Sequence, residues 1–269
     1  MSNYQKMGWK INGNHFRGNG FSLRVPPLYP GPEPMTQPDP ADDAVIRLFN
    51  VSKRFGAKLA LSNITLDIRK GEWLYVTGPS GAGKSTLLKL FYLGEKTTSG
   101  QVLAFGTNMN RLTAKEVPFL RRRFGIIFQD FKLIPNRNVF ENVALVLEAR
   151  GEPQNMIDKR TRNILRHAGM DKRMEAMPTS LSGGEQQRVA VARAIAGQPD
   201  VILADEPTGS LDPKSAEIII GLLAAYHEKG ATVMVATHDR DLLARKKGRI
   251  IRLEEGRLVE PEPVNGGRL

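Results

Sequence analysis

From Val45 onward, strand-like and helix-like runs of apolar residues alternate along the chain. Four runs are almost entirely apolar, and a polar residue follows each one; they are residues 74–76, 125–128, 201–204 and 232–236. Runs of this kind are typical of strands buried on both faces, as in a parallel sheet covered by helices. The pattern therefore predicts an α/β fold with a parallel sheet, whose ligands bind at the carboxyl ends of the strands.

Two earlier segments, residues 46–49 and 64–68, alternate instead between apolar and polar positions. Alternation is typical of strands with one face exposed, so we expect a small antiparallel sheet beside the parallel one. A long helical insert is expected between the second and third apolar runs, from about residue 139 to residue 193. Ile164, Leu165, Ala168 and Met170 recur there at helical spacing.

The first 44 residues differ in composition from the rest of the chain. Residues 26–40 are rich in proline, which lacks a backbone N–H donor and fixes an extended backbone. We therefore expect a disordered N-terminal extension over residues 1–44, one globular domain over residues 45–262 with a helical subdomain at about 130–195, and a flexible tail over residues 263–269. A docking role is the alternative for the extension, because its first thirty residues contain basic and aromatic residues but no acid.

Composition excludes several classes of protein. The chain has 269 residues, 41% of them hydrophobic, which is enough for a sizeable core. It has no cysteine, so disulfides, thiol catalysis and zinc sites with cysteine ligands are excluded. No apolar run approaches the roughly 20 residues of a bilayer-spanning helix, and no signal peptide is recognisable. We therefore expect a cytosolic protein that reaches a membrane only through a partner or its surface.

The net charge of +11 lies entirely beyond residue 44, because residues 1–44 contain four basic and four acidic residues. Basic clusters occur at residues 121–123, 159–162 and 245–249, and they would suit nucleic acid, anionic lipid or simple solubility. An ordinary solvated surface is the simplest interpretation. Nucleic acid is the least favoured partner, because the clusters lack interleaved aromatic residues and a recognisable reading helix.

The strongest motif fits the phosphate-binding loop G-x-x-x-x-G-K-[ST] at every fixed position. Its residues are Gly78, Pro79, Ser80, Gly81, Ala82, Gly83, Lys84 and Ser85. A strand-like run precedes the loop, and a helix-like run begins at Ser85 and Thr86, so backbone N–H groups can close around phosphates. Lys84 is expected to reach the β and γ phosphates and Ser85 to bind Mg²⁺. The motif predicts a binding site for a nucleoside triphosphate.

A second motif supplies the acids that the phosphate loop lacks. The apolar run 201–204 ends in Asp205 and Glu206, 121 residues after Lys84. Asp205 is expected to hold Mg²⁺ through water, and Glu206 to orient or deprotonate the water that attacks the γ-phosphate. Strand alternation is expected to turn the two side chains to opposite sides. A solvated turn is the alternative, but the phosphate loop favours the catalytic interpretation.

Residues 181–188 read Leu-Ser-Gly-Gly-Glu-Gln-Gln-Arg and resemble the signature sequence of the ATP-binding cassette (ABC) ATPases. Ser182 and Glu185 also fit a capping box that begins a helix. The resemblance implies a P-loop NTPase fold with a RecA-like parallel core, a small antiparallel β subdomain and a helical subdomain. It also implies a head-to-tail homodimer, in which Ser182, Gly183 and Gly184 contact the ATP held by the other copy.

Other positions of this chain match the family's site residues. Phe55 matches the aromatic residue that stacks on adenine, where the family more often has Tyr. Asp212, in Ser210-Leu211-Asp212, matches the loop that crosses the dimer interface, although it also fits a helix N-cap before Pro213. The resemblance implies ATP and Mg²⁺ as cofactors. It assigns catalysis to Glu206, His238, Gln129 and Lys84, and Mg²⁺ binding to Ser85, Gln129 and Asp205.

Within the family, residues 128–144 are most similar to the cassettes of bacterial cell division, through Asp130 and residues 136–139. The long N-terminal extension departs from the compact family pattern. This resemblance implies an integral membrane partner, peripheral association with the cytoplasmic face of the cell membrane at the division site, and activation of peptidoglycan hydrolases. We expect a cleft beside Gln129 to receive a helix of the partner, near Phe131, Leu133, Ile134 and Pro135.

Three other functions remain open at the level of sequence. The chain would serve as the motor of an exporter for lipoproteins, lipids or peptides with the same motifs. A soluble ABC protein acting on DNA or ribosomes fits the basic charge but not the single cassette. A nucleotide-gated scaffold would need ATP binding without turnover.

Overall fold

The computed structural model describes residues 10–12, 15–18, 21–24, 43–209, 211–239, 242–243 and 248–259. The chain divides into two units, Met1–Asp42 and Asp43–Leu269. The first contains a three-stranded antiparallel sheet of β1 (Lys10–Asn12), β2 (His15–Gly18) and β3 (Phe21–Arg24). The apolar pattern did not predict these strands. The proline-rich stretch and the C-terminal tail lie outside the described residues, so the predicted domain boundaries stay predictions.

The second unit is built on a six-stranded sheet with the order β13-β12-β6-β11-β10-β9. The strands are β6 (Trp73–Thr77), β9 (Phe124–Ile127), β10 (Val201–Asp205), β11 (Thr232–Ala236), β12 (Arg249–Glu254) and β13 (Arg257–Val259). Five of them run parallel, and β13 pairs antiparallel with β12 at the edge. The four predicted buried runs are therefore confirmed as four adjacent strands of one parallel sheet, whereas β12 and β13 were not predicted.

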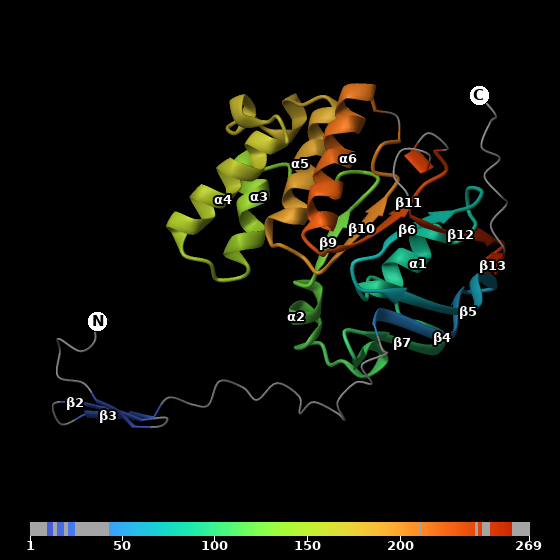
Figure 1. The fold of residues 1–269 in the computed structure, drawn as a ribbon, viewed down its shortest axis with the longest axis horizontal. Helices are drawn as coiled ribbons and strands as arrows, with labels where there is room; N and C mark the ends of the chain where they lie inside the picture. Colours follow the sequence, from blue (N-terminus) through green and yellow to red (C-terminus); the bar gives the residue numbers. More distant parts are fainter. Residues whose placement is uncertain are drawn as a thin grey trace. The chain divides into compact units, whose positions relative to one another are not determined.

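Helices cover this sheet on both faces (Figure 1). Helix α1 (Lys84–Phe91) covers one face, and α5 (Gly183–Ala196) and α6 (Pro213–Glu228) cover the other. Helices α3 (Val139–Glu148) and α4 (Gln154–His167) pack against α5. In β10, Ile202 and Ala204 join the core beneath α3 to α6, whereas Val201 and Leu203 join the core that contains α1. Because both faces of β10 are buried, Val201 to Ala204 are all apolar.

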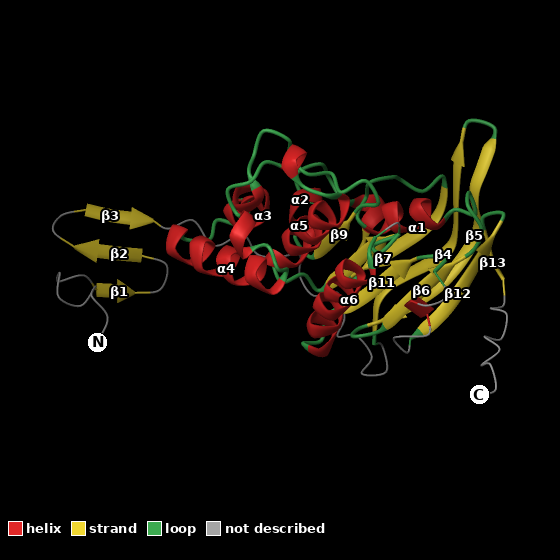
Figure 2. Cartoon of the chain, turned by 90° about the horizontal axis from the view of Figure 1, so that it is seen from above, coloured by secondary structure: helices red, strands yellow, loops and turns green. Residues whose placement is uncertain are grey.

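The core that contains α1 is closed on its other side by a four-stranded antiparallel sheet with the order β5-β4-β7-β8. Its strands are β4 (Ala44–Phe55), β5 (Lys58–Arg69), β7 (Ser99–Ala104) and β8 (Thr107–Asn108). Alternate residues of β4 and β5, such as Ile46, Leu48 and Ile64, are fully buried. The predicted antiparallel sheet is confirmed, and Figure 2 shows how its strands and those of the parallel sheet gather away from the helices of the insert.

The helical insert consists of α3, α4 and the start of α5, with short turns η3 (Asp171–Arg173) and η4 (Pro178–Ser180) between them. Two further short helices, η2 (Met109–Arg111) and α2 (Val117–Arg121), precede β9. Ser182 and Glu185 form the predicted capping box of α5, and Asp212 caps α6. Among the described helices, none combines the length and hydrophobicity that crossing a bilayer needs.

The buried side chain of Asn142 hydrogen-bonds to the backbone of the loop that precedes α3. Its side-chain oxygen accepts from the N–H of Ile134 at 2.8 Å, and its Nδ2 donates to the carbonyls of Ile134, Arg137 and Asn138 at 2.8 to 3.1 Å. We expect Asn142→Ala to lower the free energy of unfolding by about 2 to 4 kcal/mol, because several backbone groups lose their partner at once. Urea denaturation measures this loss.

The matched control for Asn142 is Asn136→Ala, since Asn136 is exposed in the same loop. It should change the free energy of unfolding by less than about 0.5 kcal/mol. Equal losses in the two variants would contradict the role given to Asn142.

Candidate functional site

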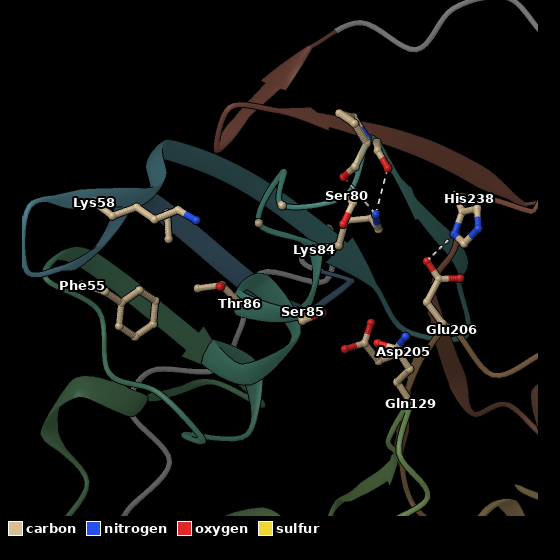
Figure 3. Close-up of a pocket in the computed structure, with 15 residues that line it drawn as sticks. Phe55, Lys58, Ser80, Lys84, Ser85, Thr86, Gln129, Asp205, Glu206 and His238 are labelled. Atoms are coloured by element: carbon tan, nitrogen blue, oxygen red, sulfur yellow. Dashed lines mark hydrogen bonds and ion pairs between the residues drawn. The ribbon is translucent and has the colours of Figure 1, made fainter. Parts of the chain in front are cut away.

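A cleft of about 560 Å³ opens at the carboxyl ends of the parallel strands (Figure 3). The phosphate loop follows β6, and Gln129 lies two residues after β9. Asp205 ends β10 with Glu206 next to it, and His238 lies two residues after β11. Each of these polar residues follows one of four adjacent strands. The sequence motifs predicted them separately, and in the structure they line the same cleft.

The phosphate loop needs glycine at two positions. Gly78 has φ 137° and Gly83 has φ 108°, conformations that L side chains rarely adopt. A Cβ at Gly78 would overlap the carbonyl of Leu253, and one at Gly83 would lie 2.6 Å from the carbonyl oxygen of Ala60. The loop is therefore packed directly against β12 and β5, and side chains are excluded from these two sites.

Lys84 is held by its own loop. Its Nζ donates to the carbonyl oxygens of Gly78 at 2.8 Å and Pro79 at 3.2 Å (Figure 3). Ser85 and Thr86 form the first turn of α1, where backbone N–H groups have no partner within the helix. The other predicted loop residues also line the cleft, except Ala82, which is buried beneath it.

Asp205 is a half-buried acid of the cleft. Burial raises the pKa of its carboxyl, and the nearby carboxylate of Glu206 adds to this rise, whereas a hydrogen bond with Ser85 and the charge of Lys84 lower it. A buried carboxylate beside a hydroxyl and a second acid favours a bound cation. Together with the amide of Gln129, these groups form an oxygen-rich donor set that fits Mg²⁺.

Mg²⁺ commonly uses only one or two protein carboxylates and completes its shell with water and phosphate oxygens. The described residues contain no group of three or more His, Cys, Asp or Glu side chains that could hold a metal ion. The hydroxyl, amide and carboxylate oxygens of Ser85, Gln129 and Asp205 match the ligand types that Mg²⁺ takes beside phosphate.

Glu206 leaves the strand in a left-handed conformation with φ 49°. Its N–H donates to the carbonyl of Ala236 at 2.9 Å, and its side chain is only 11% exposed. His238, whose side chain is 75% exposed, places Nδ1 2.8 Å from Glu206 Oε1. Glu206 therefore contacts His238 while Asp205 contacts Ser85. The two acids diverge as predicted, but through this left-handed turn rather than through strand alternation.

Phe55 lies at the end of β4 and lines the cleft with a ring that is 42% exposed. The Lys53 ammonium lies 4.6 Å from the ring centroid. Lys58 and Ala60 also line the cleft, and no sequence motif pointed to them. Lys58 is paired with Phe55 across the turn between β4 and β5, so the register of this hairpin was the signal that could have found it.

The remaining predicted site residues do not line this cleft; Ser182, Gly183, Gly184 and Asp212 lie at the starts of α5 and α6. A Cβ at Gly184 would lie 2.6 Å from Ser215 Oγ, so the two helix starts are packed together. A Cβ at Gly183 would meet only the ring of Phe131, at 3.9 Å. Contact of these residues with a nucleotide of another copy stays a prediction, and Ser210 lies outside the described residues.

Several basic residues bind within the chain itself. Arg121 donates to the carbonyls of Tyr92 and Leu93, and Arg123 pairs with Asp200 at 2.7 Å. In the other clusters, Arg160 pairs with Glu152 and Arg249 with Glu72. Residues 245–247 lie outside the described residues. These basic side chains have acceptors within the chain, which leaves fewer of them unpaired for an external polyanion.

Comparisons with known proteins agree with this geometry. The ABC transporter family matches residues 61–209. The cell division ATP-binding protein FtsE of Bacillus subtilis is 45% identical over 203 residues, which cover 76% of this chain and 89% of that protein. FtsE of Escherichia coli K12 is 43% identical over 215 residues, with coverage of 80% and 97%.

Solved structures show the same fold. The ATP-binding cassette MJ0796, a dimer in a post-hydrolysis state bound to ADP and Pi, is similar with a TM-score of 0.76 and 39% identity. The match covers 81% of this chain and 97% of the cassette. The cbiO1 protein of Clostridium perfringens, part of an ABC transporter complex, gives a TM-score of 0.73 at 30% identity, with coverage of 81% and 88%.

The phosphate loop, the acids after β10 and the signature sequence thus lie on a fold that the solved cassettes share. This chain belongs to the ABC transporter family, and it is an ATP-binding ATPase.

Proposed function

We propose that this ATPase is the cytoplasmic subunit of a membrane complex of bacterial cell division, with an integral membrane protein of the FtsX type as its partner. The similarity to FtsE proteins over about four fifths of the chain carries this proposal. Asp130 and residues 136–139, which resemble the cell-division cassettes, support it. In such a complex, ATP turnover at the inner face of the membrane at the division site activates peptidoglycan hydrolases outside, and no substrate is transported.

ATP is bound along the length of the cleft. The ring of Phe55 stacks on adenine, and the backbone N–H groups at the start of α1 hold the phosphates together with Lys84. Ser85, Gln129 and Asp205 are the residues that would hold Mg²⁺. When bound, Mg²⁺ supplies positive charge to the phosphate oxygens. The exposed ring and the oxygen-rich donor set support these assignments.

Hydrolysis depends on the side chains after β10 and β11. Glu206 accepts a proton from the attacking water, whose oxygen bonds to the γ-phosphorus as the bond to the bridging oxygen of ADP breaks. His238 hydrogen-bonds to Glu206 at 2.8 Å, so it orients the carboxylate and lies beside the γ-phosphate position. ADP and phosphate are the products.

The active form is a head-to-tail homodimer. In that arrangement the start of α5, with Ser182, Gly183 and Gly184, contacts the γ-phosphate held by the other copy, and Asp212 lies at the interface. The open space at Gly183 and the dimeric state of cassette MJ0796 support this proposal. Each nucleotide then needs residues from both copies, so an isolated subunit is a poor ATPase.

The partner's cytosolic helix binds beside the loop that follows Gln129. Phe131, Leu133 and Ile134 are half-buried and Pro135 is exposed, so this loop offers apolar surface next to the cleft. Because Gln129 lines the cleft at the start of the loop, closing the dimer on ATP moves the surface that the partner contacts.

Affinity purification from native membranes in mild detergent tests the proposal, with Glu206→Gln and ATP present to hold the dimer closed. Mass spectrometry should find a four-span FtsX-type protein, and Leu133→Glu should remove it from the eluate. A lipoprotein-release or efflux permease in its place would instead assign the chain to an exporter. Ribosomal or nucleic-acid components would overturn both membrane functions, and an intact complex with Leu133→Glu would overturn the docking site.

Phe55→Ala should raise the KM for ATP about tenfold and leave kcat within about twofold, because stacking of a base on an aromatic ring contributes about 1 to 3 kcal/mol. Steady-state phosphate release at varied ATP measures both constants. Phe55→Tyr keeps a ring face and should match the wild type. Phe119→Ala is the control, since Phe119 is 64% exposed on α2, outside the cleft. A fall in kcat at unchanged KM would contradict the stacking role.

A further inference from the structure

The backbone of the loop between β9 and α3 is strained two and three residues after Gln129. Phe131 has φ 59° and Lys132 has φ 49°, so two consecutive residues other than glycine adopt the left-handed conformation. A single such residue is uncommon, and two in succession persist only where the surroundings hold them. The contacts of this segment should therefore show what keeps Gln129 in the cleft.

Arg193 of α5 supplies those contacts. Its Nη1 donates to the carbonyl oxygen of Lys132 at 2.6 Å, and its Nη2 donates to that of Phe131 at 2.8 Å. The planar guanidinium fits two adjacent acceptors in a way that a lysine ammonium does not. The residue is half-buried, and burial lowers its pKa from the ordinary value.

No carboxylate of the described residues lies within ion-pair distance of Arg193. The two strained carbonyls are therefore its main counterparts. The ion pair between Lys132 and Asp130 is no substitute anchor, since both of its side chains are 62% exposed and such pairs contribute little.

Two side chains hydrogen-bond to the backbone of the loop between β9 and α3, each at a different part of it. Asn142 holds its later part through the backbone of Ile134, Arg137 and Asn138. Arg193 holds the earlier part, two and three residues after Gln129. Gln129 lines the cleft, and it lies between the end of β9 and the carbonyls that Arg193 holds.

We propose that Arg193 is a positioning residue for ATP hydrolysis, which keeps Gln129 in the cleft by clamping the strained carbonyls of Phe131 and Lys132. The clamp comes from α5, the helix that Ser182 caps, and Arg193 lies 61 residues further along the chain than Lys132. Arg193 thereby ties the loop of Gln129 to the signature helix within one copy. Arg193, Phe131 and Lys132 do not line the cleft, whereas Phe55 and the phosphate loop do, so we expect ATP binding to be independent of the clamp.

Steady-state ATPase kinetics of the full chain test this role, with ATP and Mg²⁺ varied separately. Arg193→Met should lower kcat at least about tenfold, keep the KM for ATP within twofold and raise the Mg²⁺ concentration for half-maximal rate. Arg193→Lys should lower kcat less, because one donor direction replaces two. Arg150→Met is the matched control, since the exposed Arg150 donates to the carbonyl of Arg122 at 2.7 Å, away from the loop, and it should keep wild-type kinetics.

A second change separates clamping from general stability. Glycine adopts positive φ without penalty, so Lys132→Gly should restore kcat of Arg193→Met about fivefold while altering the wild type less than twofold. A folded Arg193→Met or Arg193→Lys protein with wild-type kcat would overturn the proposal. So would a double variant without recovery, or a loss of kcat matched by an equal loss of ATP binding and a lower melting temperature.

Discussion

Replacing Glu206 by Gln is expected to lower kcat for ATP hydrolysis at least about 100-fold, while the affinity for ATP changes less than about twofold. The amide keeps the shape and the contact distance to His238 but cannot accept the proton of the attacking water. Glu206 is 11% exposed and hydrogen-bonded at 2.8 Å, so the substitution disturbs little else. Phosphate release measures kcat, and a fluorescent ATP analogue measures affinity.

Glu148→Gln is the control for this substitution. Glu148 forms an exposed surface pair with Arg137 at 3.5 Å, and such pairs contribute little to stability. Its kcat should equal that of the wild type. If Glu206→Gln retained more than about a tenth of wild-type kcat, Glu206 would not be the general base, since loss of such a group removes a factor of about 100 or more.

Lys84→Ala should weaken ATP binding about 100-fold, measured by calorimetric titration of the full chain. Each hydrogen bond from a charged donor contributes about 1.5 to 3 kcal/mol, and Lys84 is placed to give two of them to the phosphates. The backbone N–H groups of α1 remain, so residual binding is expected. Hydrolysis falls with binding because the phosphates are no longer fixed.

The control for Lys84→Ala is Lys115→Ala, which removes an exposed ammonium outside the cleft and keeps the net charge of the two variants equal. This comparison separates a specific contact from the general attraction of a basic protein for a polyanion. Equal losses of affinity in both variants would show that net charge, and not Lys84, governs ATP binding.

The parts of the site that sequence could predict are those encoded locally. The phosphate loop has fixed spacing from Gly78 to Ser85, and the apolar strand before Asp205 places the acid at the sheet edge without knowledge of any other segment. The caps at Ser182 and Asp212 each join two residues that are three positions apart, so they too were predictable.

What sequence did not predict depends on register and on distant packing. Lys58 enters the cleft only because it is paired with Phe55 across a hairpin turn. Strand β12 contains Arg249 and Arg252, so its sequence does not show the continuous apolar run that marks a buried strand. Arg193 acts on carbonyls 61 and 62 residues away, and no spacing rule connects a helix side chain to backbone atoms at that separation.

The hydrogen bonds of Lys84 to Gly78 and Pro79 have a consequence for the free energy of phosphate binding. The ammonium donates to two carbonyl oxygens of its own loop. A phosphate oxygen that accepts from this ammonium therefore competes with carbonyl acceptors as well as with water. The net contribution of Lys84 is consequently a difference between two sets of hydrogen bonds, and it is smaller than the sum of the bonds formed.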